Sequence, residues 1–176
     1  MRLRRPHGSF IAENTAVIVV LLLALTFPLI NLAAAAYRYN MVCGAAKAAA
    51  HAGASAPTFL VATSVGTPAS QVIPAVVNNY LGNAKGVSNV VIKYRINQSN
   101  INTQQVTNNA WGTPLAQPCD PDLYIYTIEV VVDADVAPLV SMAKSGIVPN
   151  VPGLTGPTHQ SVASQEVVET ISGLNQ

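Results

Sequence analysis

An apolar run near the N-terminus, residues 16–36, constrains the fold of this chain more than any other feature. In a helix, about 20 apolar residues at about 1.5 Å each span a hydrocarbon core of about 30 Å. The interruptions are mild, because Thr26 can bond back to a carbonyl of the preceding turn and Pro28 removes one helix bond and is expected to bend the helix. We therefore expect one transmembrane helix over residues 9–37.

The basic residues around this run predict its orientation. Arginines stand at positions 2, 4 and 5, whereas only Arg38 and Lys47 follow the run closely. The positive-inside rule then places the N-terminus in the cytoplasm and the rest of the chain outside. Tyr37 and Tyr39 stand where an interfacial aromatic belt is expected. The prediction is a single-pass protein of the cytoplasmic membrane, with a basic leader at 1–8 and an extracytoplasmic domain at 38–176.

Composition and motifs argue against several classes of function. The formal net charge is +1 and 10% of the residues are charged, so nothing indicates a nucleic-acid partner. No nucleotide-binding, nucleophile-elbow or zinc-protease motif is present, and we expect no enzyme activity, small-molecule substrate or cofactor. The pairs Asp120/Asp122 and Asp133/Asp135 could hold calcium, but such pairs are more often solvated turn residues. No metal site is predicted.

The chain has two cysteines, Cys43 and Cys119, which are far apart in sequence. Together with His7, His51 and His159 they show no metal-ligand spacing. If residues 38–176 are exported, the cysteines are in an oxidising compartment. We therefore expect a disulfide between them, which would tie the polar loop around Cys119 to the helix that carries Cys43.

The exported part predicts an α+β fold, in which the long N-terminal helix packs with a small antiparallel sheet. Helix is expected over 37–56 and again from Thr67, as N-cap before Pro68, to about Leu81, although Pro74 interrupts the second helix. Residues 58–67 are ambiguous between strand and loop. Alternating or β-branched segments predict three strands, 87–96, 123–134 and 158–170. Between them lie a long polar loop, 97–122, and a Pro- and Gly-rich linker, 146–157.

Glu13, just before the apolar run, is open to three interpretations. It can be a first-turn residue at the membrane interface, where the helix dipole favours a carboxylate. The run can instead be the apolar region of a signal peptide, with an Ala-x-Ala cleavage site at Ala34–Ala36. In the third interpretation, Gly8 and Glu13 act together.

Gly8 followed five residues later by Glu13 resembles the processing site of type IV pilins and pseudopilins. The sequence from Tyr37 through the Ala-rich stretch 43–54 resembles TadE-like proteins, the minor pseudopilins of tight-adherence (Flp-type) pili. The family usually has Phe after the glutamate, where this chain has Asn14.

The resemblance implies a pilin-like fold and a structural role in assembly of a Flp or type IV-like pilus, or of a related secretion or adhesion apparatus. It implies cleavage between Gly8 and Ser9 by prepilin peptidase, and contact of Glu13 with a positive group on a neighbouring subunit. The expected partners are the membrane, other pilin or pseudopilin subunits and the assembly machinery. The alternative is an exported binding or enzymatic domain released by signal peptidase near Ala36.

Overall fold

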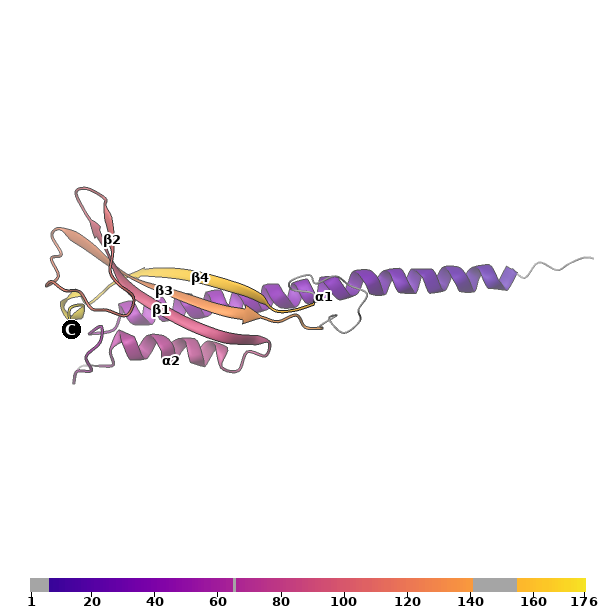
Figure 1. Ribbon diagram of the computed structural model, residues 1–176, viewed down its shortest axis with the longest axis horizontal. Coiled ribbons are helices and arrows are strands. Elements are labelled where there is room, and N and C mark those ends of the chain that lie inside the picture. The colour runs from indigo at the N-terminus through magenta and orange to yellow at the C-terminus, as the bar shows by residue number, and fades with distance from the viewer. Residues whose placement is uncertain (1–6, 65, 141–154) are drawn as a thin grey trace, which may run out of the picture.

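The computed structural model describes residues 7–64, 66–140 and 155–176, with side chains from residue 14 onward. The chain is an α+β structure in which a long helix projects from a layer of sheet (Figure 1). The elements in chain order are α1 (His7–Ala54), α2 (Ala69–Leu81), β1 (Val87–Asn100), β2 (Val106–Asn108), β3 (Tyr124–Val136), β4 (Thr158–Val167) and the 3-10 helix η2 (Ile171–Gly173).

Helix α1 is continuous for 48 residues, so the apolar run and the Ala-rich stretch form one element. Leu, Val and Ala favour helix or tolerate it, and Gly and Pro are rare within the run. The Thr26 hydroxyl donates to the Leu22 carbonyl oxygen at 2.7 Å, as the sequence predicted. Pro28 lies inside the helix without ending it.

The sheet has four antiparallel strands in the order β2-β1-β3-β4. In β3, buried Ile128, Val130 and Val132 alternate with Glu129, Val131 and Asp133, which lie on the opposite face. This period of two gives the sheet one apolar face and one polar face. All three predicted strands are present with small changes of boundary.

The helices cover the apolar face of the sheet. The C-terminal half of α1 contacts β3 and β4, and α2 packs beside α1 near β1 (Figure 1). The contacting positions of α1 are small; Ala45, Ala46, Ala49 and Ala50 are fully buried. Small side chains allow the helix to lie close to its neighbours, and a Cβ added at Gly53 would be 2.8 Å from Ile73 Cδ1. The predicted packing of the long helix with the sheet is confirmed.

Four backbone hydrogen bonds join the last residues to the end of the domain farthest from the projecting helix. The amide of Glu169 donates to Ala54 O at 3.1 Å, and that of Leu60 donates to Gln176 O at 2.8 Å. Phe59 N donates to Gly173 O, and Leu115 N donates to Leu174 O. The C-terminal segment therefore links the end of α1 to the loops on either side of the sheet.

The remaining differences from the sequence prediction are local. Pro68, not Thr67, is the N-cap of α2, and no side chain caps that end. Residues 58–67 contain no strand among the described positions, only an isolated bridge between Thr63 and Gly66. The polar loop predicted at 97–122 is shorter, because β1 continues to Asn100 and β2 lies within the loop. Most of the predicted linker lies outside the described residues.

Candidate membrane-anchoring and assembly site

The N-terminal half of α1 exposes its apolar side chains on all sides. Leu22 is 57% exposed, Leu25 58% and Leu29 56%. Among the described residues, one helix is long and apolar enough to cross a membrane, and it is α1, whose most apolar stretch is almost wholly exposed. A helix that is apolar all round and not buried in its own protein requires an apolar environment, from lipid or from neighbouring helices.

A buried asparagine marks the boundary between the exposed and covered halves of α1. Asn31 is 1% exposed although it lies within the apolar run. Its Nδ2 donates to Val140 O at 2.9 Å, and its Oδ1 accepts from Val140 N at 2.9 Å. This pair of bonds satisfies both polar atoms of the amide side chain and fixes the segment after β3 to the helix.

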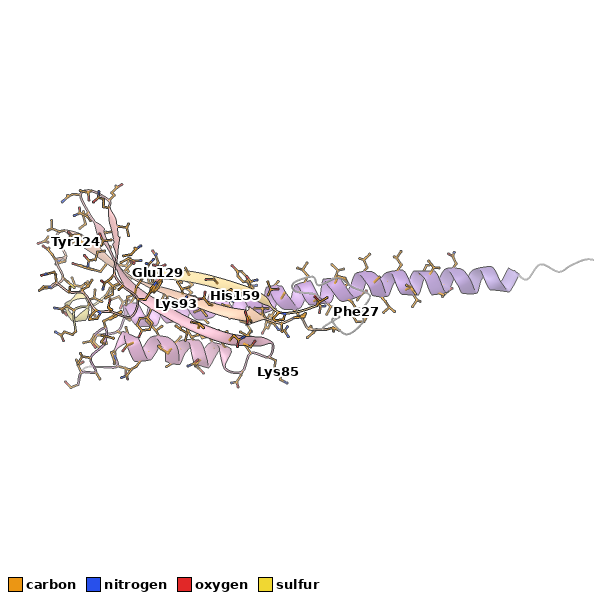
Figure 2. The ribbon with its side chains drawn as sticks, in the orientation of Figure 1. Phe27, Lys85, Lys93, Tyr124, Glu129 and His159 are labelled. Carbon is orange, nitrogen blue, oxygen red and sulfur yellow. The ribbon has the colours of Figure 1, made fainter. Side chains whose placement is uncertain are left out.

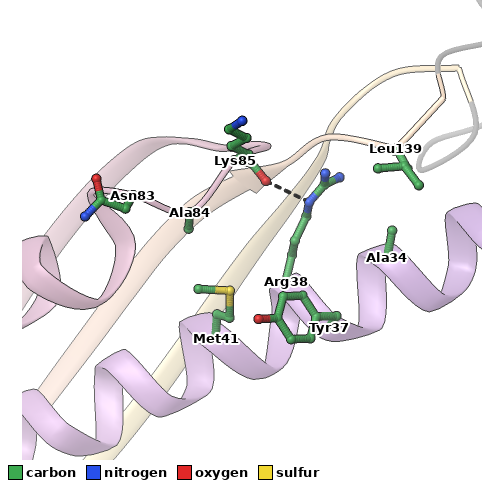
Figure 3. Close-up of a pocket in the computed structure, with 8 residues that line it drawn as sticks. All are labelled: Ala34, Tyr37, Arg38, Met41, Asn83, Ala84, Lys85 and Leu139. Atoms are coloured by element: carbon green, nitrogen blue, oxygen red, sulfur yellow. Dashed lines mark hydrogen bonds between the residues drawn. The ribbon is translucent and has the colours of Figure 1, made fainter.

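Arg38 lies two helical turns after Asn31 and makes a second connection to the domain. Its Nε donates to Lys85 O at 3.0 Å (Figure 3), and its Nη1 donates to Ala137 O. Gly86, with φ of +85°, lies against the guanidinium, and a Cβ there would collide with it. Only glycine combines this backbone conformation with so close an approach. The residues just before β1 and just after β3 thus hold the guanidinium in place.

The sequence prediction used Arg38 only for membrane orientation and did not use Asn31. Their spacing was the available signal, because residues seven apart lie on the same face of a helix. An Asn within an apolar run, followed seven residues later by an Arg, indicates one polar stripe on an otherwise apolar helix. The partners could not be found in this way, since they are backbone groups about 50 to 110 residues away.

The predicted processing and assembly residues lie at the start of α1. Gly8, Ser9 and Glu13 are within its first two turns. Their side chains are outside the described part of the structure. The role of Glu13 and the cleavage between Gly8 and Ser9 therefore stay predictions.

The expected disulfide is wrong for this structure, because Cys43 and Cys119 are both free thiols. Cys119 lies near Leu174 and Tyr126. Tyr126 O accepts from Val168 N and Ala54 O accepts from Glu169 N, so this region is level with the end of α1. Cys43 is eleven residues before that end, or about 16 Å along the helix. A disulfide requires Cα atoms within about 7 Å. Burial raises the pKa of the Cys119 thiol, although a backbone hydrogen bond with Leu174 opposes the change.

Charged side chains line the polar face of the sheet in three clusters. Figure 2 labels Glu129, Lys93 and His159, one from each cluster. In the first cluster, Arg95 Nε and Asn97 Nδ2 each lie 2.8 Å from a Glu129 carboxylate oxygen. In the second, Lys93 Nζ lies 3.0 Å from Asp133. In the third, Asn89 Nδ2 lies 2.7 Å and His159 Nδ1 3.0 Å from Asp135. The Arg95 guanidinium lies over the indole ring of Trp111, with its Cζ 4.3 Å from the ring centroid. The clusters join β1, β3 and β4 across the sheet.

Hydrogen bonds shift the pKa of each carboxylate in these clusters. Burial raises the pKa of Glu129, but bonds from Arg95 and Asn97 outweigh it and hold the value below the usual one. Ser161 and Lys93 lower the pKa of Asp133, and Asn89 and His159 lower that of Asp135. Each of these carboxylates accepts hydrogen bonds from side chains within the sheet. In the described residues, no group of three or more His, Cys, Asp or Glu side chains is placed to hold a metal ion.

Comparison with known proteins adds no family to this description. No protein-family model, curated protein or solved structure matches the chain. The fold and the exposed helix are therefore the observations from which a function is proposed.

Proposed function

We propose that this chain is a structural, pilin-like subunit of the TadE-like kind, which acts in assembly of a Flp or type IV-like pilus or a related secretion or adhesion apparatus. The observation that carries the proposal is the continuity of α1. One half of the helix is apolar and exposed, and the other half is the central helix of a small α+β domain. In this proposal the exposed half lies in the cytoplasmic membrane before assembly and contacts neighbouring subunits afterwards.

The orientation follows from the basic leader, which stays in the cytoplasm while the domain folds outside. The partners are the membrane, other pilin or pseudopilin subunits and the assembly machinery, including prepilin peptidase for cleavage between Gly8 and Ser9. The role is mechanical rather than catalytic, and it needs no cofactor. The chemistry of recognition is apolar packing along α1, with Glu13 as the polar group that sets the register between helices.

Two contacts favour a domain that stays attached to its helix over a domain released near Ala36. Cleavage there would remove Asn31 and its two hydrogen bonds to Val140. It would also leave Arg38 beside a new chain end. Helix α1 runs through Ala36 without interruption, whereas a peptidase needs an accessible, extended segment.

The proposal is tested first by the mass of the mature chain and then by substitution of Glu13. A mature chain that begins at Ser9 supports the pilin-like role, whereas one that begins near Tyr37 supports the released domain. Glu13→Leu should leave membrane insertion intact, because it removes a charge from the apolar segment, and should impair incorporation into the pilus. Glu13→Gln should be intermediate.

Asn14→Leu is the matched control, since it adds an apolar side chain at the next position and keeps the carboxylate. Incorporation is measured by immunoblot of sheared surface fibres from cells that lack the wild-type copy. Normal incorporation of Glu13→Leu would contradict the assembly role of Glu13.

A further inference from the structure

The Arg38 side chain carries a buried positive charge that no carboxylate in the described chain neutralises. The residue is 9% exposed. The ion pairs of the described residues involve Lys93, Arg95 and His159, not Arg38. Carbonyl dipoles accept two of its N–H groups, and the other N–H groups have no partner in the described structure. A largely buried guanidinium with unpaired N–H groups favours an anionic partner.

A groove of ≈ 410 Å³ lies beside this guanidinium and is lined by Arg38 itself (Figure 3). Its other walls are mainly apolar and come from α1, through Ala34, Tyr37 and Met41, and from Leu139 after β3. Asn83 and Lys85 also line the groove, and none of its described lining residues is acidic. An anion with an apolar attachment fits this combination better than a fully hydrated ion does.

The position of the groove along α1 agrees with the outer surface of a bilayer. Thr15 and Arg38 are 23 residues apart, which corresponds to about 35 Å of helix, and the hydrocarbon core is about 30 Å thick. Leu139, 55% exposed, and Val140, 40% exposed, lie at the same end of the domain. The groove therefore opens where the exposed apolar surface of α1 meets the domain.

We propose that this groove binds the phosphate of an anionic phospholipid from the outer leaflet of the membrane. The free N–H groups of Arg38 donate to the phosphate oxygens, Lys85 adds a long-range attraction, and the glycerol and first acyl carbons lie against Tyr37 and Leu139. The inference rests on the proposed membrane anchoring of α1. Its consequence is that a bound lipid fixes the depth and rotation of the domain before the subunit leaves the membrane.

The test is native mass spectrometry of the full chain in detergent, with phosphatidylglycerol or phosphatidylcholine added at equal concentration. We expect the wild-type chain to retain phosphatidylglycerol preferentially. Arg38→Gln should weaken this retention about tenfold, as expected for loss of one charge-assisted contact. Lys47→Gln, which removes a cation from an exposed site on the same helix, should have no effect.

Further arms identify the source of the phosphate and include a variant, Lys85→Gln, that keeps both backbone hydrogen bonds of Arg38. Lys85→Gln leaves the Lys85 carbonyl in place and should weaken retention by less than Arg38→Gln does. Inorganic phosphate at millimolar concentration should neither bind detectably nor displace the lipid; binding of phosphate alone, with no preference for phosphatidylglycerol, would overturn the lipid assignment. Equal retention of both lipids, or loss with Lys47→Gln as well, would overturn the site.

Membrane insertion of the same variants is measured separately by resistance to alkaline extraction. A chain that inserts but does not distinguish the lipids contradicts only this inference. A chain that does not insert contradicts the proposed function.

Discussion

The two halves of α1 belong to one helix but have opposite relations to the rest of the molecule. Val and Leu dominate the N-terminal half, whose side chains are about half exposed. Ala and Gly dominate the C-terminal half, whose contacting side chains are fully buried. The more hydrophobic side chains of this helix are therefore the exposed ones, and the less hydrophobic ones are buried.

The difference teaches that size rather than hydrophobicity selects the half that packs against the sheet. A helix can lie close to a sheet and a second helix only where its side chains are short, and contacts at short range then replace the area that larger side chains would bury. The larger apolar side chains have no counterpart within the domain. Their environment must come from outside this chain, which is why the halves should respond differently to substitution.

A charge in the exposed half should have the largest effect. Leu25→Lys places an ammonium near the middle of the apolar run, where insertion is expected to cost about 3 kcal/mol. The fraction of chain that resists alkaline extraction should fall strongly. Asn40→Lys, just beyond the run, should insert as the wild-type chain does. Full insertion of Leu25→Lys would show that this half is not surrounded by lipid.

A larger side chain in the buried half should have the next largest effect, and on a different quantity. Ala49→Leu overfills a position that is 0% exposed and should lower the free energy of unfolding by about 2 kcal/mol. Ala24→Leu, the same change in the exposed half, should shift it by less than about 0.5 kcal/mol. Urea unfolding in detergent, followed by fluorescence of the single tryptophan, Trp111, measures both. Equal effects would remove the distinction between the halves.

Acid should have the smallest effect, and only on the domain. The pKa values of Glu129, Asp133 and Asp135 are lowered in the folded state. A lowered carboxyl pKa stabilises the fold above the unfolded value of about 4, and this contribution is lost as the pH falls through the folded value. The urea midpoint should therefore decrease below about pH 4. Glu129→Gln should show a weaker dependence on pH, and an unchanged slope would exclude Glu129 as a contributor.

Local patterns in the sequence were sufficient for most of the fold. The apolar run, the alternation of Ile92, Tyr94 and Ile96, and the β-branched segment around Val131 each report on one element and its nearest neighbours. The strand β2 was missed because Val106–Asn108 is a three-residue edge within a polar stretch and has no period to detect. Its position depends on pairing with β1, which the local sequence does not encode.

The candidate site was predicted less completely, because its contacts join distant parts of the chain. The exposed helix followed from composition, but the bonds of Asn31 and Arg38 end on backbone carbonyls and amides that any residue carries. The disulfide between Cys43 and Cys119 was inferred from the compartment and the cysteine count, neither of which gives a distance. Only the register of α1 against the sheet places the two thiols far apart.

The bonds between the last residues and the end of α1 set an order of events in time. Because Gln176 and Gly173 accept hydrogen bonds from Leu60 and Phe59, the domain cannot close until residues 171–176 are available to it. If α1 enters the membrane first, the segment that completes the core crosses long afterwards, and closure of contacts this distant in sequence is slow. Until then, helix α1 would be in the membrane while its Ala-rich half is not yet covered by the sheet. In the orientation proposed above, the nascent domain is then most accessible to chaperones and proteases outside the cytoplasm.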